Sequence, residues 1–597
     1  MPIPDDQRLI TNATRRPYAA LPLGWAALLL YLTLAPADRL PPQPQWELLS
    51  FDTFAHAAFF AVLAALAWFS LRRQRRWRYL ARHAGWAVLL GGTAFGALIE
   101  ALQMALPFNR HGEWSDLLSD GIGTALALGL AHLGAPALQR RGWALSLLAV
   151  LGLNTSTRAQ DVARARRAIE KLAAPQMHGR GYVQQGEHKA AAYLRGRFRE
   201  LKLVPLAPDY TQPFMLDVNT FPGQVSLAFG DSAMWSGGRP LRRLPPLRPG
   251  LDYIAAAASA GTSGATRWLH VVELPDSAAL GNAASSWWQW ARRQPRQKWA
   301  LAVPQRALPL LAALPPPLRQ RLDSVARLTI VPKLTASVSS EVAPNLRFEV
   351  LEQAWRAFAG RAQVAAPLAN FVGLALDAQL RRNYPTQNLA AVIRGSVQPD
   401  SFLVVSAHYD HLGMMGKAVY FPGANDNASG VAMLLELAAH YARPKNRPAC
   451  SVAFLLFGGE EAGLVGSEYF VTHPLIPLNS IKFLVNLDLL GTGEQGATVV
   501  NGRVFEAPYR RLVALNGAHH YLPQLAPRGR AANSDHYPFS EAGVPAFFLY
   551  TRGGSTAYHD VNDRPAALSL AGFAGAFGLV RDFLNEEGAA PRAKKSR

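Results

Sequence analysis

Hydrophobic residues are distributed unevenly along the 597-residue chain. Long apolar stretches occur at about residues 18–36, 51–71, 84–106 and 117–138, whereas the rest of the chain contains shorter ones. Each long stretch approaches the roughly 20 residues that an α-helix needs to cross the hydrocarbon core of a bilayer. The pattern predicts that residues 1–138 form a membrane region of four transmembrane helices, followed by a separate region with a different fold.

Arginine residues between the apolar stretches indicate how the membrane region is oriented. They are concentrated before the first stretch, between the second and the third, and after the fourth, whereas the other two links carry only Arg39 and Arg110. Links rich in Arg and Lys stay in the cytoplasm. We therefore expect a multi-pass protein of the cell inner membrane with its N-terminus in the cytoplasm.

A shorter apolar segment, Gly142–Leu153, lies in the linker 139–160. Its basic flank, its apolar core and the small residues near Ala159 are typical of an internal signal sequence. As a fifth span, or as a signal cleaved near Ala159, the segment predicts that the remainder of the chain lies on the periplasmic, extracytoplasmic side. A helix lying on the inner membrane surface is the competing interpretation, and it would leave that remainder in the cytoplasm.

Three motifs of the membrane region resemble a known family. E-A-L-Q begins at Glu100, P-F-N-R begins at Pro107, and W-S-D-L-L-S-D-G-I-G covers residues 114–123. Over about residues 15–138 the chain is similar to the VanZ-like family of small membrane proteins, although Asp120 stands where we expect Asn. The biochemical role of that family is poorly defined, so the resemblance implies a membrane partner but no reaction and no ligand.

Beyond residue 161 short apolar runs alternate with amphipathic ones. From Asn388 onward the runs predict strands at residues 388–395, 402–407, 451–457, 481–487 and 544–550, and helices at 427–441, 464–473 and 566–585. Such alternation favours an α/β fold, a mixed sheet flanked by helices on both faces. We expect this domain to cover residues 161–590, with a Pro- and Ala-rich subdomain inserted at about 215–345 and a basic tail at 591–597.

Composition adds two constraints. The formal net charge is +20, but much of it comes from arginines beside apolar segments, and no RNA-binding or DNA-binding motif accompanies it. We therefore expect no nucleic-acid partner. The single cysteine, Cys450, excludes an intramolecular disulfide bond.

Acidic and imidazole side chains follow the predicted strands. His408 follows V-V-S-A, Glu460 and Glu461 follow A-F-L-L-F-G-G, and Asp488 follows F-L-V-N-L. Side chains at the carboxyl ends of neighbouring strands meet in one cleft, where the ligand sites of such sheets usually lie. The pattern therefore indicates an enzyme with a shared acidic site.

Asp426 and His559 extend this set to one that can hold two metal ions. Asp426 lies in G-A-N-D-N-A-S-G, whose small residues let two ions approach one carboxylate, so it is the natural bridging ligand. Zinc accepts N and O ligands, and two ions about 3.5–4 Å apart can hold a water between them. Glu460 and Glu461 are consecutive, so their side chains diverge. One of them can bind metal while the other acts as a general base.

The motifs H-Y-D, N-D-N-A-S-G, G-E-E-A-G-L-V-G-S, N-L-D and Y-H-D, in this order, resemble the zinc aminopeptidases and carboxypeptidases of peptidase family M28. The similarity runs over about residues 160–590 and is strongest from residue 388 onward. It implies that Asp426 is shared by two zinc ions, with a cis peptide bond between Asp426 and Asn427. It also implies that His408 and Asp488 bind one zinc and that Glu461 and His559 bind the second. In the implied mechanism Glu460 is the general base, Asp410 orients His408, and Tyr558 polarises the scissile carbonyl.

Other polar residues receive supporting or structural roles. Each motif taken alone has a structural explanation, such as a helix cap at Glu460 or an Asx turn at N-D-N. Asp535 and His536 are candidates for supporting the ligands, and Arg552 is a candidate for contacting a peptide carboxylate. We interpret the remaining histidines of this region as structural or surface residues, namely His411, His440, His519 and His520.

The sequence therefore predicts a peptidase with two Zn²⁺ ions that removes N-terminal residues from a peptide substrate. A hydroxide that bridges the metals attacks the peptide carbonyl, and Glu460 passes the proton to the leaving amine. Carboxypeptidase activity remains an alternative, as does glutaminyl cyclisation, which resembling enzymes perform with one zinc; the presence of both His408 and Asp488 argues for two ions. A non-catalytic envelope-binding or antibiotic-resistance protein is the alternative from another class, and the intact Glu460 argues against it.

Overall fold

The computed structural model describes residues 19–34, 51–73, 77–105, 119–125, 127–128 and 161–589, the last range with gaps at 231–234, 237–238, 241–246, 258–264, 276, 341 and 365–370. The chain divides into two compact units, residues 1–157 and 158–597. The apolar segment expected at 142–153 and the basic tail at 591–597 lie outside the described residues.

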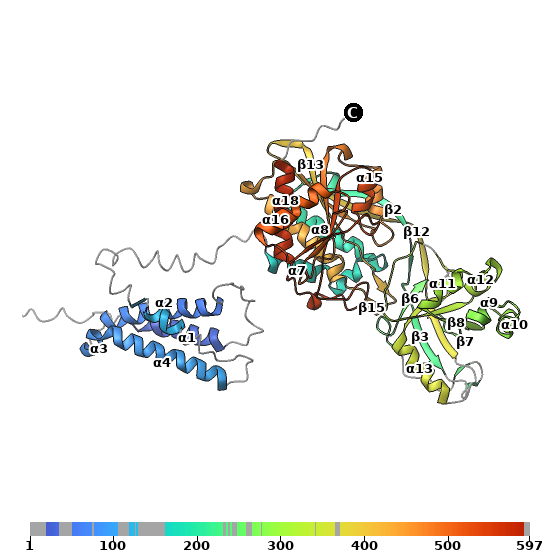
Figure 1. The fold of residues 1–597 in the computed structure, drawn as a ribbon, viewed down its shortest axis with the longest axis horizontal. Coiled ribbons are helices and arrows are strands. Elements are labelled where there is room, and N and C mark those ends of the chain that lie inside the picture. The colour runs from blue at the N-terminus through green and yellow to red at the C-terminus, as the bar shows by residue number, and fades with distance from the viewer. Residues whose placement is uncertain are drawn as a thin grey trace, which may run out of the picture. The chain divides into compact units, whose positions relative to one another are not determined.

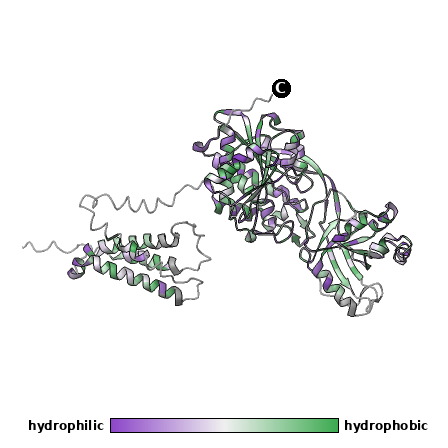
Figure 2. Ribbon diagram, viewed as in Figure 1, coloured by the Kyte–Doolittle hydropathy of each residue, from purple (hydrophilic) through white to green (hydrophobic). Residues whose placement is uncertain are grey.

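The first unit is helical. Its described helices include α1 (Ala20–Leu34), α2 (Phe51–Arg73), α3 (Arg78–Arg82) and α4 (Ala84–Ala105), and residues 119–125 and 127–128 are also helical. Leu29, Phe60 and Ile99 pack together between α1, α2 and α4, and Figure 2 shows hydrophobic residues along these helices. Within the described part of the chain, no helix combines the length and the hydropathy that crossing a bilayer requires. The four spans therefore stay predictions, and most of the fourth lies outside the described residues.

The second unit is built on a nine-stranded mixed sheet (Figure 1). Its strand order is β1-β12-β16-β13-β17-β20-β18-β19, and β2 pairs with β12 beside this path. The central strands β16, β13, β17 and β20 are parallel to one another, whereas β12 and β18 are antiparallel to the strands at the two ends of this group. The bounds are β1 Val204–Pro205, β2 Thr211–Thr220, β12 Gln379–Ile393, β13 Gln398–His408, β16 Cys450–Phe457, β17 Ile481–Leu487, β18 Ala497–Val500, β19 Leu525–Pro527 and β20 Ala546–Thr551.

Both faces of this sheet are buried. In β13, Leu403 and Val405 belong to one hydrophobic cluster, whereas Phe402 and Val404 belong to another. Successive side chains of a strand point to opposite faces, so the two clusters lie on the two sides of the sheet. The first face is covered by α7 (Val162–Leu172), α8 (Gly186–Glu200), α14 (Gly430–Tyr441), α16 (Glu506–His519) and α18 (Phe573–Ala589), and the second by α15 (Val465–Thr472) and α17 (His536–Glu541).

The predicted mixed sheet with helices on both faces is confirmed for this unit. The strands expected at 402–407, 451–457 and 481–487 fall within β13, β16 and β17. The helix expected from residue 427 starts later, at Gly430, because Asp426 and Asn427 have non-helical backbone angles in the preceding turn. The C-terminal helix expected at 566–585 covers Phe573–Ala589 instead.

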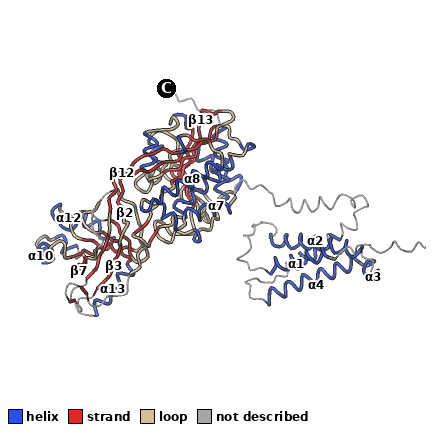
Figure 3. Tube along the Cα trace, turned by 180° about the vertical axis from the view of Figure 1, so that it is seen from behind, coloured by secondary structure: helices blue, strands red, loops and turns tan. Residues whose placement is uncertain are grey.

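A second, seven-stranded sheet is inserted into the chain between β2 and β12 (Figure 3). Its strand order is β3-β11-β7-β8-β9-β10-β6, with β7, β8, β9 and β10 parallel. The sheet extends past the boundary expected at about residue 345, because β11 pairs with both β3 and β7. The bounds are β3 Val225–Gly230, β6 Tyr253–Ala257, β7 Arg267–Glu273, β8 Trp299–Pro304, β9 Ala326–Val331, β10 Arg347–Leu351, β11 Phe371–Leu376, α9 Ser277–Gly281, α10 Ser286–Arg293, α11 Leu308–Ala312, α12 Pro316–Asp323 and α13 Glu352–Val364.

The inserted sheet shares a core with segments that come from elsewhere in the second unit. Met415, Phe421 and Val561 are buried in the same hydrophobic cluster as its strands. The paired strands β2 and β12 lead into and out of the insertion (Figure 1). The insertion is therefore packed against the segments that follow β13 and β20.

Candidate metal centre

The carboxyl ends of three neighbouring parallel strands bring polar side chains to one edge of the main sheet. His408 is the last residue of β13, Glu460 and Glu461 follow β16 after two glycines, and Asp488 follows β17 directly. Because β16, β13 and β17 are adjacent in the sheet, the side chains at their ends meet.

Asp426 reaches the same edge from the turn Ala424–Ser429, which precedes α14. Its peptide bond to Asn427 is cis, as the resemblance to family M28 implies. Gly423 starts the turn with φ 59°, and a Cβ atom there would lie 2.2 Å from the carbonyl oxygen of Asp426. Only glycine fits at this position.

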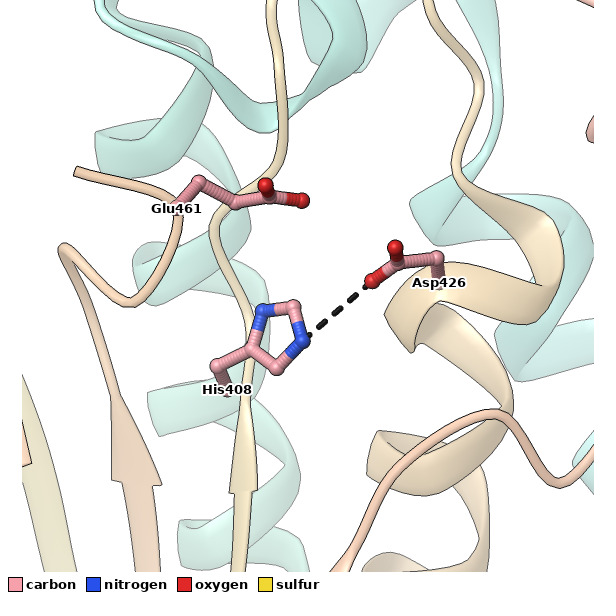
Figure 4. Close-up of side chains that lie close together, drawn as sticks. All are labelled: His408, Asp426 and Glu461. Carbon is pink, nitrogen blue, oxygen red and sulfur yellow. Dashed lines mark ion pairs between the residues drawn. The ribbon is translucent and has the colours of Figure 1, made fainter. Parts of the chain in front are cut away.

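The five predicted ligands form two groups that share Asp426. In the first group, Nε2 of His408 lies 3.3 Å from Asp426 Oδ1 and 3.5 Å from Asp488 Oδ1. In the second group, Nε2 of His559 lies 3.1 Å from Asp426 Oδ2 and 3.3 Å from Glu461 Oε2. Asp426 therefore turns one carboxylate oxygen toward each imidazole. Figure 4 shows the Asp426 and Glu461 carboxylates pointing toward the space beside the His408 ring.

A chain of hydrogen bonds holds Asp488 in place. Ser406 Oγ donates to Asn486 Oδ1 at 2.8 Å, and Asn486 Nδ2 donates to Ser534 Oγ at 2.8 Å. Ser534 Oγ in turn donates to Asp488 Oδ2 at 2.8 Å. The other oxygen, Oδ1, is buried and accepts no hydrogen bond from the described residues. A buried carboxylate oxygen without a donor is costly, so this set of side chains fits a divalent cation.

Asp410 lies beside the ring of His408 and also contacts the turn after β16. Its carboxylate oxygens accept hydrogen bonds from the backbone N–H groups of Glu460 and Glu461, at 3.2 and 3.3 Å. The hydroxyl of Tyr182 donates to the same carboxylate at 3.0 Å. His408 Nδ1 lies 3.7 Å from Asp410 Oδ1 but 3.2 Å from the Asp410 carbonyl oxygen. The carbonyl group and the carboxylate of Asp410 both lie near His408 Nδ1, and the carboxylate also holds the backbone of the two glutamates. The orientation of His408 by Asp410 stays a prediction.

The sequence does not identify the buried Arg180, although it lies in the Gly-rich turn M-H-G-R-G-Y. Its side chain is 0% exposed. The guanidinium donates to the carbonyl oxygens of Tyr409 at 2.8 Å, Pro422 at 2.7 Å, Gly423 at 2.9 Å and Asp426 at 3.0 Å. Arg180 thus joins the end of β13 to the turn that presents Asp426.

Two further residues that sequence reasoning did not place in the site contact predicted ligands. His411, interpreted as structural or surface, is fully buried, and its Nδ1 lies 2.7 Å from Glu461 Oε1. Asp563 accepts hydrogen bonds from the backbone N–H groups of Asn425 at 2.8 Å and Asp426 at 3.0 Å. Their positions within H-Y-D-H and within the residues after Y-H-D are the signals that could have identified them.

The crowded carboxylates change the protonation of the site. Burial disfavours the imidazolium form of His408, but the charges of Glu460 and Asp488 outweigh burial and raise its pKa well above the ordinary value. Burial also raises the pKa of Glu460 well above its ordinary value, and the charge of Glu461 adds to this rise against the attraction of His408. A raised pKa makes the Glu460 carboxylate a stronger proton acceptor, which suits a general base.

A cavity of about 430 Å³ opens beside the two groups of ligands. Tyr558 lies in its wall, and the phenol ring stacks on the imidazole of His559 with centroids 4.0 Å apart. The wall also contains the apolar side chains of Leu464, Leu489 and Phe548. The site therefore combines charged groups with an apolar surface that a substrate side chain can contact.

The weaker sequence candidates lie elsewhere. Arg552 does not line this cavity, and its Nη2 donates to the Gln495 carbonyl at 2.9 Å and to Gln524 Oε1 at 3.0 Å. A contact with a peptide carboxylate is therefore not supported for Arg552. Asp535 and His536 are fully buried, and burial raises the pKa of Asp535 to about 7. The hydrogen bond that supports a ligand comes from their neighbour Ser534.

Both family resemblances are confirmed by comparison with family models. Residues 388–584 match the model of Peptidase family M28, and residues 12–135 match the model of VanZ/LLP1. The chain therefore combines a VanZ/LLP1 region near its N-terminus with a Peptidase family M28 region near its C-terminus.

Curated relatives match shorter parts of the chain. A probable zinc metalloprotease of Pyricularia oryzae is 35% identical over 143 residues, which is 23% of this chain and 27% of that protein. Aminopeptidase YwaD of Bacillus subtilis is 30% identical over 169 residues, which is 27% of this chain and 35% of that protein. This chain thus spans between 27% and 35% of the length of these relatives.

A solved structure covers more of the chain. The crystal structure of a Peptidase M28 precursor from Shewanella amazonensis matches with a TM-score of 0.54 and 16% identity, over 74% of this chain and 96% of that one. At this identity the match shows a shared fold for the second unit.

Proposed function

We propose that this chain is a zinc-dependent peptidase that holds two Zn²⁺ ions and removes N-terminal residues from peptides. The proposal depends on Asp426, whose two carboxylate oxygens face the imidazoles of His408 and His559 at 3.3 and 3.1 Å. A carboxylate shared in this way suits a pair of ions about 3.5–4 Å apart. The likeness to zinc metalloproteases and to an aminopeptidase supports this activity.

The ligands divide between two ions. His408 and Asp488 would hold one zinc, Glu461 and His559 would hold the other, and Asp426 would be shared. When bound, zinc lowers the pKa of a water to about 7 and polarises a carbonyl oxygen as a Lewis acid.

Glu460 is the general base of the proposed reaction. Its Oε2 lies 3.9 Å from His408 Nε2, farther than the nearest oxygens of Asp426 and Asp488, although Glu460, His408 and Asp488 also lie close enough together to hold an ion. Its backbone is held by the carboxylate of Asp410. Glu460 takes the proton of the attacking water and delivers it to the leaving amine.

Tyr558 and the apolar wall position the substrate. Burial raises the pKa of Tyr558, so its hydroxyl keeps its proton and can donate a hydrogen bond to the carbonyl oxygen of the scissile bond. Leu464, Leu489 and Phe548 would contact the side chain of the N-terminal residue. We therefore expect a preference for peptides with an apolar N-terminal residue.

In this proposal the N-terminal region spans the inner membrane, and the peptidase unit lies outside the cytoplasm. The arginine-rich links and the match to VanZ/LLP1 support an inner-membrane protein whose second unit lies on the periplasmic side. Release by cleavage near Ala159 would give a soluble form of the same enzyme.

The proposal is tested with purified full-length protein and peptides that begin with leucine. A peptide with a free N-terminus should be shortened from that end, its N-acetylated counterpart should stay intact, and a zinc chelator should abolish the activity until zinc is restored. Shortening of the acetylated peptide from its C-terminus would instead indicate a carboxypeptidase. A separate peptide that begins with glutamine is included, and its conversion to the pyroglutamate form would indicate cyclisation. The absence of any zinc-dependent reaction on these peptides would refute the proposed function.

A further inference from the structure

The inserted sheet contacts the loop that carries Tyr558 and His559. This loop, residues 556–561, follows β20 and is called the ligand loop below. The contacting segment, residues 333–336, follows β9 of the inserted sheet and is called the β9 extension. Three kinds of contact join the two segments or anchor the loop in the insertion.

The first contact is to the ring and backbone of His559. Its Nδ1 donates to the carbonyl oxygen of Ala336 at 2.8 Å, and the N–H of Ala336 donates to the carbonyl oxygen of His559 at 2.9 Å. The opposite ring nitrogen, Nε2, is the one that faces Asp426 and Glu461. A partner of the second ring nitrogen fixes the tautomer and the orientation of a metal-binding histidine. In this protein that partner lies 223 residues away in the chain.

The second contact is made by Lys333. Its ammonium group donates to the carbonyl oxygen of Thr556 at 2.8 Å and lies 4.0 Å from Asp560 Oδ2. One side chain of the β9 extension therefore holds both ends of the segment that contains Tyr558 and His559.

The third contact is hydrophobic. Val561, at the end of the ligand loop, is 6% exposed and belongs to the core of the inserted sheet. Gly250 leaves room for it, since a Cβ atom at residue 250 would lie 2.8 Å from Val561 Cγ1. The insertion thus fixes the ligand loop beyond His559 as well as before it.

The backbone of His559 also requires external support. Its φ angle is 54°, in the left-handed region. Residues other than glycine keep this conformation where the surrounding structure holds them. The two hydrogen bonds between His559 and Ala336 are placed to hold His559 in this conformation.

We propose that the inserted sheet is part of the catalytic apparatus, with Ala336 and Lys333 as positioning residues for His559 and Tyr558. The proposal rests on the proposed function, because it takes His559 as a zinc ligand. The other four predicted ligands come from the strand ends of the main sheet and from the turn before α14. Because the β9 extension bonds directly to His559, we expect the insertion to affect the zinc held by Asp426, Glu461 and His559 more strongly than the zinc held by His408 and Asp488.

The test uses full-length protein and two substitutions in the β9 extension. Lys333→Met removes the ammonium group, and Ala336→Pro removes the N–H that donates to His559. Lys298→Met is the matched control, because Lys298 is an exposed lysine of the same inserted sheet region and lies outside the β9 extension. Two quantities are measured: hydrogen exchange of the amides at 556–561 in chelator-treated protein, and zinc affinity by competition with a chelator.

We expect faster exchange at 556–561 in both variants and wild-type exchange in the control. The zinc held by Asp426, Glu461 and His559 should lose affinity by about 10–100-fold in Ala336→Pro, because loss of the Ala336 N–H frees the backbone of His559 and so loosens the ring whose Nδ1 donates to the Ala336 carbonyl. The other zinc should keep its affinity.

Wild-type exchange and wild-type zinc affinity in Lys333→Met and Ala336→Pro would overturn the proposal. If Ala336→Pro does not fold, Lys333→Met decides, because the Lys333 side chain is 47% exposed and its loss leaves no cavity. If the wild-type protein binds no zinc, the proposed function fails, while the exchange measurement, which needs no metal, still decides whether the insertion holds the loop.

Discussion

The substitution Glu460→Gln separates proton transfer from metal binding. Glutamine has the same shape as glutamate, and the hydrogen bond from the backbone N–H of residue 460 to Asp410 Oδ1, at 3.2 Å, does not involve the side chain. Asp426 and Asp488 approach His408 Nε2 to 3.3 and 3.5 Å, closer than Glu460 at 3.9 Å. We therefore expect the variant to bind zinc as the wild type does.

The expected loss is in the catalytic rate. A general base contributes about 10²–10⁴-fold, which is about 2.7–5.4 kcal/mol at 1.36 kcal/mol for each factor of ten. The other carboxylates that line the cavity are Asp426, Glu461 and Asp488, all predicted ligands. Asp535 is fully buried and does not line it. Because no other carboxylate is placed to replace Glu460, we expect a loss in the upper half of this range.

The assay measures kcat on a leucine peptide at saturating zinc, together with the zinc content of each protein. Glu461→Gln is the matched control, since Glu461 Oε2 lies 3.3 Å from His559 Nε2 and its loss should release zinc. Near-normal kcat in Glu460→Gln, or loss of zinc from Glu460→Gln but not from Glu461→Gln, would refute the assignment of these two roles.

Three further predictions concern a ligand support, stability and topology. Ser534→Ala removes the hydrogen bond to Asp488 Oδ2 and should weaken zinc binding about 10–100-fold in a chelator competition; unchanged affinity would contradict the support role. Burial and the charge of Arg581 lower the pKa of His440 from 6.5 to about 4, so its contribution to stability is present above pH 6.5 and is lost as the pH falls toward 4. Urea unfolding of His440→Leu should depend less on pH in this window, and an equal dependence would contradict the reasoning. A reporter that is active only after export should be active when fused at residue 165 and inactive at residue 78, and the opposite result at 165 would place the peptidase in the cytoplasm.

Much of the main sheet was predictable because its strands are continuous apolar runs. Strands buried on both faces have this pattern, and the runs before His408, Glu460 and Asp488 match β13, β16 and β17. Neighbouring parallel strands end on the same edge, so the meeting of these side chains was predictable as well. The exact start of α14 was not, because the turn 424–429 leads directly into the helix and its non-helical backbone angles at Asp426 and Asn427 are set by the fold.

The N-terminal helices show what hydropathy alone does not decide. The apolar stretches at 51–71 and 84–106 coincide with α2 and α4, so the helices were predictable. Whether they cross a bilayer depends on their surroundings, and the described helices do not have the length and hydropathy of a span. The export assay addresses this question directly.

The order and chemistry of the candidate ligands are properties of the sequence by itself, since each lies in a short motif next to a strand or a tight turn. The supports of those ligands were decided only by the tertiary structure. The Arg180 guanidinium donates to backbone carbonyl oxygens of the site, and Ala336 bonds to His559 through its own backbone. Backbone groups occur along the whole chain, so neither contact leaves a pattern in the sequence. Ala336 meets His559 across 223 residues because an inserted sheet folds back against the loop after β20, and packing between distant segments is set by the whole fold.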